Sequence, residues 1–265
     1  MKIGVVGCAG RMGQMLVREI AATPGCTLAG GTERVGGPAL GRDIGELAGL
    51  DPLGVTAIDD PALLFAEADA VIDFTSPAAT ERHAALAAQA QTVLVVGTTG
   101  LNPAQQASLV QAASHTPIIQ SPNMSVGVNL LMALVEQVAR TLGEDYDIDV
   151  LEMHHRHKVD APSGTALGLG HAAAAGRGVA LEDVWRKSRD GHTGPRPAGE
   201  IGFATLRGGD VIGDHTVMFA GDGERIELTH KASGRGIYAK GAVRAALWAR
   251  DKTPGLYSMR DVLGL

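Results

Sequence analysis

The first half of the chain alternates between two hydrophobic patterns. Short apolar runs, typical of buried strands, alternate with segments in which apolar residues recur every three or four positions, as on one face of a helix. The runs predict strands at residues 2–6, 27–31, 68–74, 92–96 and 117–120, and the periodic segments predict helices from residue 14 and at 77–90. This alternation of strand and helix predicts an α/β fold with a doubly wound, parallel, Rossmann-type sheet.

The pattern changes after residue 125. A long apolar helix at residues 126–142 is followed by a strand at 148–153 and by strand-like segments between 201 and 228. We therefore predict a second, α+β domain at residues 126–234. A last helix at 238–250 is expected to return to the first domain, which then comprises residues 1–125 plus 235–265. The polar stretch 186–199, rich in glycine and proline, is expected to be a mobile surface loop.

Composition argues against several classes of protein. The net charge of −6, without an evident basic face, argues against a nucleic-acid-binding protein. No apolar run approaches the roughly 20 residues that span a bilayer, and glycines interrupt the apolar start of the chain, so neither a membrane protein nor a signal peptide is expected. The two cysteines, Cys8 and Cys26, make no disulfide framework, which is typical of a cytoplasmic protein.

A glycine-rich turn follows the first strand. Gly7, Gly10 and Gly13 lie in the sequence GCAGRMG, where the strand runs into a helix. Glycines at such a turn let backbone N–H groups approach a pyrophosphate, and the helix N-terminus adds a favourable positive potential. The spacing differs from the more usual G-x-G-x-x-G, so a glycine-rich turn of some other α/β protein is an alternative.

Glu33 and Arg34 follow this turn at about the distance, some twenty residues, of the residue that reads the adenosine ribose. Glu33 suits the ribose hydroxyls of NAD, whereas Arg34 suits the additional phosphate of NADP. Both NADH and NADPH therefore stay open as cofactors. An ordinary solvated Glu–Arg pair is the plainer alternative.

Three segments follow the ends of later strands. Residues 97–100, GTTG, and residues 121–124, SPNM, are expected to approach the nicotinamide half of the cofactor, because parallel sheets bind ligands beyond the carboxyl ends of their strands. Residues 74–77, FTSP, occupy an equivalent place. Each could be a simple turn, but their repetition at successive strand ends favours a binding crevice.

The stretch LEMHHRHKVDAPSGTAL, residues 151–167, concentrates acid–base side chains. Histidine donates protons near neutral pH, and a nearby lysine binds a carboxylate or acts as an acid, which suits His154, His155 and Lys158. A zinc site is the alternative, but His154 and His155 would point to opposite sides of a continuing strand, and no H-E-x-x-H motif is present. We therefore predict an acid–base cluster without a metal.

The second part of this stretch reads as a loop that enters a helix. Ser163 is the expected N-cap, and the N–H groups of Gly164 and Thr165 suit a carboxylate or a phosphate. Together with a dinucleotide turn, this arrangement predicts reduction of an anionic, unsaturated substrate. Two alternative hypotheses are a zinc-dependent hydrolase built on the histidines and a non-enzymatic sensor of NAD(P).

Several segments resemble the dihydrodipicolinate reductase family. They are GCAGRMG at 7–13, GTTG at 97–100, PNMS at 122–125, residues 152–167, IGFATLRGGDVIGDHTVMF at 201–219 and the end of the chain from residue 241. The resemblance implies a two-domain reductase of lysine and diaminopimelate biosynthesis, which converts 4-hydroxy-tetrahydrodipicolinate to tetrahydrodipicolinate with NADH or NADPH. It also implies a homotetramer built through the sheets of residues 126–234, the substrate-binding and oligomerisation domain.

The resemblance also assigns roles by motif position. It implies that His154 donates the proton, assisted by Lys158, and that His155, Lys158, Gly164 and Thr165 bind the carboxylates of a small dicarboxylate substrate. The implied cofactor contacts are Gly7, Cys8, Ala9, Gly10, Arg11, Met12, Glu33, Arg34, Gly97, Thr98, Thr99, Ser121, Pro122, Asn123 and Met124. Two positions depart from the family: Met124, where an aromatic residue is common, and Ser233-Gly234-Arg235, where arginine usually follows the serine directly. The second departure leaves the role of Arg235 open.

Overall fold

The computed structural model describes residues 1–265, which form two compact units. One unit consists of Met1–Val126 together with Gly236–Leu265, and the other of Gly127–Arg235. The first unit is therefore discontinuous in sequence, because the chain leaves it after its sixth strand and returns to it near the C-terminus.

A seven-stranded parallel sheet forms the centre of the first unit, with the strand order β12-β6-β5-β4-β1-β2-β3. The strands are β1 (Lys2–Val6), β2 (Thr27–Thr32), β3 (Ala57–Ile58), β4 (Ala70–Asp73), β5 (Val93–Val96), β6 (Pro117–Gln120) and β12 (Gly255–Tyr257). Every residue of β4 and β5 is buried, as expected for strands covered on both faces. The doubly wound α/β fold predicted from the sequence is confirmed.

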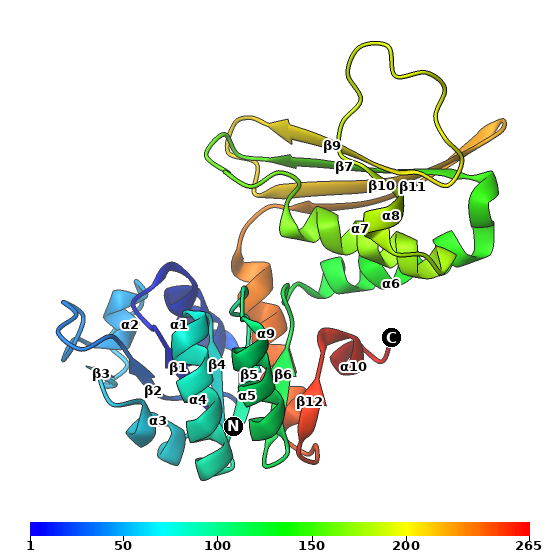
Figure 1. Ribbon diagram of the computed structural model, residues 1–265. Coiled ribbons are helices and arrows are strands. Elements are labelled where there is room, and N and C mark those ends of the chain that lie inside the picture. The colour runs from blue at the N-terminus through cyan, green and yellow to red at the C-terminus, as the bar shows by residue number, and fades with distance from the viewer. The chain divides into compact units, whose positions relative to one another are not determined.

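Helices cover both faces of this sheet (Figure 1). One hydrophobic core includes residues of α1 (Arg11–Ala22), α2 (Ile44–Leu47), α9 (Gly236–Ala249) and α10 (Met259–Leu263), and another includes residues of α3 (Pro61–Glu67), α4 (Pro77–Ala90) and α5 (Pro103–Ala113). The helices α3, α4 and α5 each begin with a proline behind a capping side chain, from Asp60, Ser76 and Asn102 respectively. A proline suits this place because the first N–H of a helix has no partner within the helix.

A five-stranded mixed sheet forms the second unit, with the order β11-β10-β7-β9-β8. Its strands are β7 (Asp147–His154), β8 (Trp185–Arg186), β9 (Ile201–Arg207), β10 (Gly213–Gly221) and β11 (Glu224–Ala232). The helices α6 (Val126–Leu142), α7 (Gly164–Arg177) and α8 (Leu181–Val184) lie on one face of the sheet (Figure 1), and the single turn η1 (Gly143–Asp145) links α6 to β7. The predicted α+β character of this part of the chain is confirmed.

Residues 187–199 contain no helix or strand and rise from the side of this sheet opposite the helices (Figure 1). Arginines of this segment pair with carboxylates of the sheet: Arg189 with Asp149 and Glu200, at 3.0 and 3.1 Å, and Arg196 with Asp149. Arg196 also donates to the backbone oxygens of Ile148 and Glu200. The predicted surface loop is therefore tied to the start of β7 by its charged side chains.

No helix in the structure combines the length and the apolar character needed to cross a membrane.

Candidate active site

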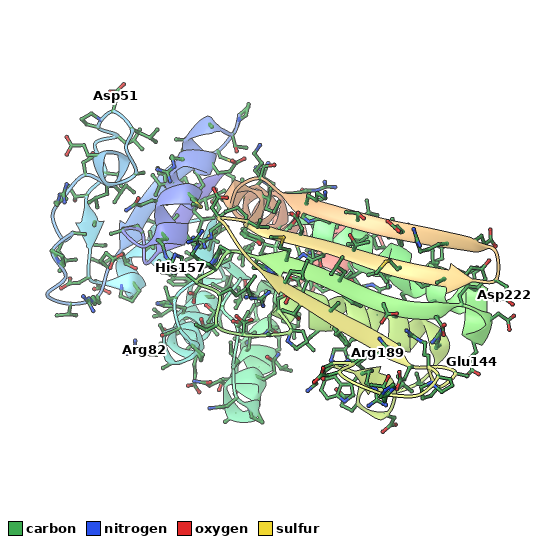
Figure 2. The ribbon with its side chains drawn as sticks, turned by 90° about the horizontal axis from the view of Figure 1, so that it is seen from above. Asp51, Arg82, Glu144, His157, Arg189 and Asp222 are labelled. Atoms are coloured by element: carbon green, nitrogen blue, oxygen red, sulfur yellow. The ribbon has the colours of Figure 1, made fainter.

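The histidine stretch lies at one end of the second unit's sheet. Strand β7 ends at His154, a loop of eight residues follows, and α7 starts after its N-cap, Ser163. Figure 2 shows His157 at this end of the strands and Asp222, in the turn between β10 and β11, at the opposite end. Backbone hydrogen bonds join this loop to the loop between β9 and β10: the N–H of His155 donates to the oxygen of Val211 at 2.7 Å, and the N–H of Arg156 donates to the oxygen of Gly209 at 3.2 Å.

Glu152 is the buried centre of this site, with a relative exposure of 1%. Its carboxylate accepts hydrogen bonds from both terminal nitrogens of Arg207, at 2.8 and 3.0 Å, and from the backbone N–H of Ser163 at 3.0 Å. It also lies 2.5 Å from Nδ1 of His154. Burial opposes the charge of Glu152, but the hydrogen bonds from Arg207, His154 and Ser163 outweigh it and lower the pKa of this carboxyl.

His154 is oriented by Glu152. Because Nδ1 is held by the carboxylate, Nε2 is the nitrogen left for a ligand. A Cβ atom at Gly213 would lie 3.0 Å from Nε2, so glycine keeps the space beside this nitrogen open. Burial lowers the pKa of His154, Glu152 raises it, and the positive charges of Lys158 and Arg207 lower it; the net direction is downward. The ring is therefore largely neutral at neutral pH in the absence of an anion.

A further buried histidine, His215, packs against His154. The ring centroids are 5.0 Å apart in an edge-on arrangement, and Nε2 of His215 lies 3.1 Å from Oγ of Ser163. Burial, followed by the charge of His154, lowers the pKa of His215 to about 4, so this ring is neutral at physiological pH. His215 thus joins β10 to the start of α7 without adding a second positive charge beside His154.

The start of α7 has the predicted capping geometry. Oγ of Ser163 accepts from the backbone N–H of Ala166 at 3.1 Å, and Gly164 is exposed while Thr165 is half-buried. The ammonium group of Lys158 pairs with Asp160 at 2.7 Å. His155 is half-buried, and its Nδ1 has no hydrogen-bond partner. The structure therefore brings His154 and Ser163 together through Glu152, whereas Lys158 pairs with the exposed carboxylate of Asp160.

No group of three or more histidine, cysteine, aspartate or glutamate side chains converges in a way that would hold a metal ion.

In the first unit, the glycine-rich turn is tightly packed between β1 and α1. Gly7 has a φ of +70°, and its N–H and that of Cys8 donate to the oxygen of Thr32 at 2.8 and 3.0 Å. A Cβ atom at Gly13 would lie 2.1 Å from the oxygen of Gly7, so only glycine lets the helix approach the strand this closely. Burial raises the pKa of the Cys8 thiol to about 12, which keeps it protonated.

The carboxylate of Glu33 reaches back to this turn. Its Oε1 accepts from the N–H of Ala9 at 2.8 Å, whereas Arg34 is exposed. Gly10 and Arg11 are exposed and Met12 is half-buried. The arrangement places the predicted ribose-reading carboxylate against the backbone that is expected to approach a pyrophosphate.

The other predicted cofactor segments lie beyond the ends of β5 and β6. Thr98, Thr99 and Pro122 line a pocket of about 300 Å³, together with Gly100, Leu101, Gln106 and Gln120. The amides of Gln106 and Gln120 pair reciprocally at 2.8 and 2.9 Å, a feature that their fourteen-residue separation did not reveal in the sequence. A Cβ atom at Gly97 would collide with the ring of Phe74, at 2.2 Å.

Residues 121–124 divide between surface and core. The hydroxyl of Ser121 donates to the oxygen of Asn123 at 2.7 Å, and Pro122 is exposed. The side chain of Met124 is only 1% exposed and belongs to the core of the first unit. Arg235 is half-buried in the link between β11 and α9.

Both parts of the chain match models of one protein family. Residues 1–124 match the model "Dihydrodipicolinate reductase, N-terminus" and residues 127–263 match "Dihydrodipicolinate reductase, C-terminus". Two relatives are named 4-hydroxy-tetrahydrodipicolinate reductase: one from Mesorhizobium japonicum, numbered 1 in its name, is 60% identical over all of this chain and 97% of its own length, and one from Brucella abortus is 59% identical over all of this chain and 99% of its own.

A solved structure shares the fold. It is described as a dipicolinate-bound dihydrodipicolinate reductase from Paenisporosarcina sp. TG-14, and it matches with a TM-score of 0.76 over 97% of each chain at 22% identity. The family models cover nearly the whole sequence, and the full-length relatives share more than half of its residues. The chain belongs to the dihydrodipicolinate reductase family.

Proposed function

We propose that this protein reduces 4-hydroxy-tetrahydrodipicolinate to tetrahydrodipicolinate with NADH or NADPH, in lysine and diaminopimelate biosynthesis. The observation that carries the proposal is the buried Glu152, which holds both His154 and the N-cap residue Ser163 of α7. Glu152 thereby holds in place both the proton donor, His154, and the start of α7, which would bind a substrate carboxylate. Both cysteines are free thiols, which supports a place in the cytoplasm.

The first unit is suited to hold the dinucleotide. The φ of +70° at Gly7 and the backbone contacts around Gly13 both call for glycine at this turn, which supports close approach of the pyrophosphate. Glu33 would bind the adenosine ribose, and exposed Arg34 would meet the additional phosphate of NADPH. The backbone of residues 97–99 and 121–124 would bind the nicotinamide, which supplies the hydride to an unsaturated ring carbon of the substrate.

The second unit would bind the dicarboxylate and supply the proton. The substrate carboxylates would be held by His155, Lys158 and the helix start at Gly164 and Thr165. Lys158 would release its ion pair with Asp160 and pair with a substrate carboxylate in its place. A substrate carboxylate near His154 raises the pKa of this ring, which burial and Lys158 lower in its absence. When the substrate is present, His154 would carry a proton on Nε2 and protonate the electron-rich intermediate that hydride addition leaves. The 4-hydroxyl group leaves as water, so that the substrate, the reduced cofactor and one proton give tetrahydrodipicolinate, the oxidised cofactor and water.

A coupled assay tests this function. The purified protein is mixed with the condensation product of pyruvate and aspartate semialdehyde, and the absorbance of the reduced cofactor is followed. We expect NADH and NADPH each to be consumed only when that product is present. Saturable cofactor binding without consumption would favour a sensor of NAD(P), and stoichiometric zinc in the purified protein would favour a hydrolase.

We also propose that the protein is a homotetramer built through the second unit's sheet. The face opposite the helices carries an apolar stripe on three neighbouring strands, made of Leu151, Met153, Ala204, Leu206 and Met218. Leu206 is 48% exposed. Beside the stripe, Asp214 and Lys231 are paired in register on β10 and β11, so the face carries both signs of charge and suits a second copy of itself.

Replacement of Leu206 by aspartate is expected to dissociate this assembly, because it places a charge inside the apolar stripe. Sedimentation analysis should show smaller particles than the wild type at the same concentration. Leu63→Asp is the matched control, since Leu63 is 60% exposed on α3 of the first unit. The assembly proposal is wrong if Leu206→Asp sediments as the wild type does, or if the wild type is a monomer.

A further inference from the structure

Asp73 is a buried carboxylate at the carboxyl end of β4 that neither the reaction nor the family motifs engage. Its side chain is fully buried. Oδ1 accepts from the N–H and the hydroxyl of Thr75, at 2.8 and 2.6 Å, and from the hydroxyl of Thr98 at 3.2 Å. Oδ2 accepts from the hydroxyl of Thr80 at 2.9 Å and lies 2.8 Å from Nδ1 of His83. The two oxygens therefore serve two different parts of the fold.

Oδ2 anchors Asp73 to the helix. Thr80 and His83 both belong to α4 and are buried, and neither lies near a predicted cofactor contact in sequence. Burial opposes the charge of Asp73, but hydrogen bonds from His83 and the threonines outweigh it and lower the pKa of this carboxyl. The carboxylate is thus ionised and immobile.

Oδ1 holds the loops that leave the sheet. Thr98 belongs to the GTTG segment, and the backbone N–H of Gly97 donates to the backbone oxygen of Asp73 at 2.9 Å. The methyl group of Thr75 lies 3.0 Å from the place of a Cβ atom at Gly7. The carboxylate therefore connects the loop after β4 with the loop after β5, and Thr75 of the first loop packs beside Gly7 of the glycine-rich turn.

The hydroxyl of Thr98 is occupied within the protein. It donates to Asp73 and accepts from the N–H of Thr75 at 3.1 Å, and the residue is only 7% exposed. Its one proton is therefore not available to a ligand. A ligand can therefore contact Thr98 through its backbone, and the hydrogen bond to Asp73 fixes the conformation of that backbone.

We propose that Asp73 is a positioning residue for the dinucleotide, acting through Thr75 and Thr98 to hold the 97–100 loop in its binding conformation. The proposal rests on the proposed place of the nicotinamide beside residues 97–99. An ionised carboxylate suits this role because hydrogen bonds to a charged acceptor are shorter and stronger than those between neutral groups.

A double-mutant cycle tests the proposal. Asp73→Asn removes the charge, Thr98→Val removes the hydroxyl at nearly constant volume, and the NADH dissociation constant is measured by fluorescence titration for both variants and their combination. We expect each single variant to bind NADH about tenfold more weakly, the size of one lost hydrogen bond to a charged group. The double variant should bind NADH no more weakly than the single variant with the lower affinity, because both substitutions remove the same hydrogen bond between Thr98 and Asp73.

Thr80→Val is the matched control, since it removes a buried hydrogen bond to the same carboxylate from the helix side. We expect it to lower the thermal midpoint of the cofactor-free protein as much as Thr98→Val does, and to leave NADH binding within about twofold of wild type. Thr98→Ser keeps the hydroxyl and should restore NADH binding. If Asp73→Asn does not fold, the contrast between Thr98→Val, Thr98→Ser and Thr80→Val decides the question.

Equal losses of NADH affinity in Thr98→Val and Thr80→Val would overturn the proposal, because the effect would then be general destabilisation. Additive losses in the cycle would also overturn it, since Thr98 would then act on the cofactor independently of Asp73. Wild-type affinity in Thr98→Val would do the same. These outcomes are separable from failure of the proposed reaction, in which the wild type binds NADH but does not consume it in the coupled assay.

Discussion

The double variant His154→Ala/Lys158→Ala is expected to lose about 10³- to 10⁴-fold in kcat, the upper part of the range for removal of a general acid. Without the His154 imidazole, the ring left beside Gly213 is that of His215, whose pKa of about 4 keeps it neutral and a poor proton donor at physiological pH. Without Lys158, a bound carboxylate loses its cation, so the KM for the dicarboxylate should rise as well. NADH affinity should stay within about twofold of wild type, because both residues belong to the second unit and the glycine-rich turn to the first.

Steady-state kinetics and NADH fluorescence titration check this split between turnover and cofactor binding. His157→Ala is the control, because His157 lies in the same loop but is exposed. It should turn over as the wild type does. Normal turnover in the double variant would show that another group supplies the proton, and a parallel loss of NADH affinity would show that the change acts through folding.

Gly13→Ala is expected to abolish detectable NADH binding. The new methyl group would lie 2.1 Å from the oxygen of Gly7 and 2.7 Å from two backbone atoms of Cys8, all of which belong to the glycine-rich turn. Because backbone cannot move aside as a side chain does, α1 must shift away from β1 and the turn must change shape. Such overpacking typically costs about 1–3 kcal/mol in the free energy of unfolding.

The thermal midpoint, measured with and without NADH, separates the two consequences of Gly13→Ala. The wild type should be stabilised by the cofactor, and the variant should melt earlier and gain nothing from it. Gly236→Ala is the control, since a Cβ atom at Gly236, also in the first unit, meets nothing within 4 Å. A Gly13→Ala protein that NADH still stabilises would mean that the turn tolerates the shift, and that the cofactor does not depend on its shape.

The parts of the fold that the sequence predicts best are those with strong local patterns. The helices at residues 77–90 and 126–142 and the strand at 117–120 have the predicted bounds. The first helix starts at a proline behind the capping Ser76, and the second is mostly apolar along its length. Helix α5 is not predicted, since its buried face consists of Leu109 and two alanines among polar residues. Helix α1 begins at Arg11, inside the glycine-rich turn and before its apolar period starts.

The site shows the limit of local patterns more clearly. Glu152 is one of several acidic residues in its strand, beside Asp147 and Asp149, and its importance appears only through Arg207, 55 positions later. His215 likewise meets Ser163 across 52 positions. The one local signal was the alternation of β7, in which even-numbered positions face the core and Glu152 occupies one of them. A carboxylate on a buried face must have hydrogen-bonding or charged partners, but the sequence alone does not show which residues these are.

The discontinuous first unit also has a consequence for synthesis of the chain. Helix α9 contributes Ala242, Val243, Ala245 and Ala246 to the core beneath the sheet, and β12 pairs with β6 at its edge. These elements leave the ribosome only after all of residues 127–235 have emerged. The second unit can therefore complete its core during translation, while the nascent dinucleotide unit has α1 and α2 but not yet α9 and α10 on one face of its sheet. The dinucleotide unit therefore begins to be synthesised before the second unit but completes its core after it.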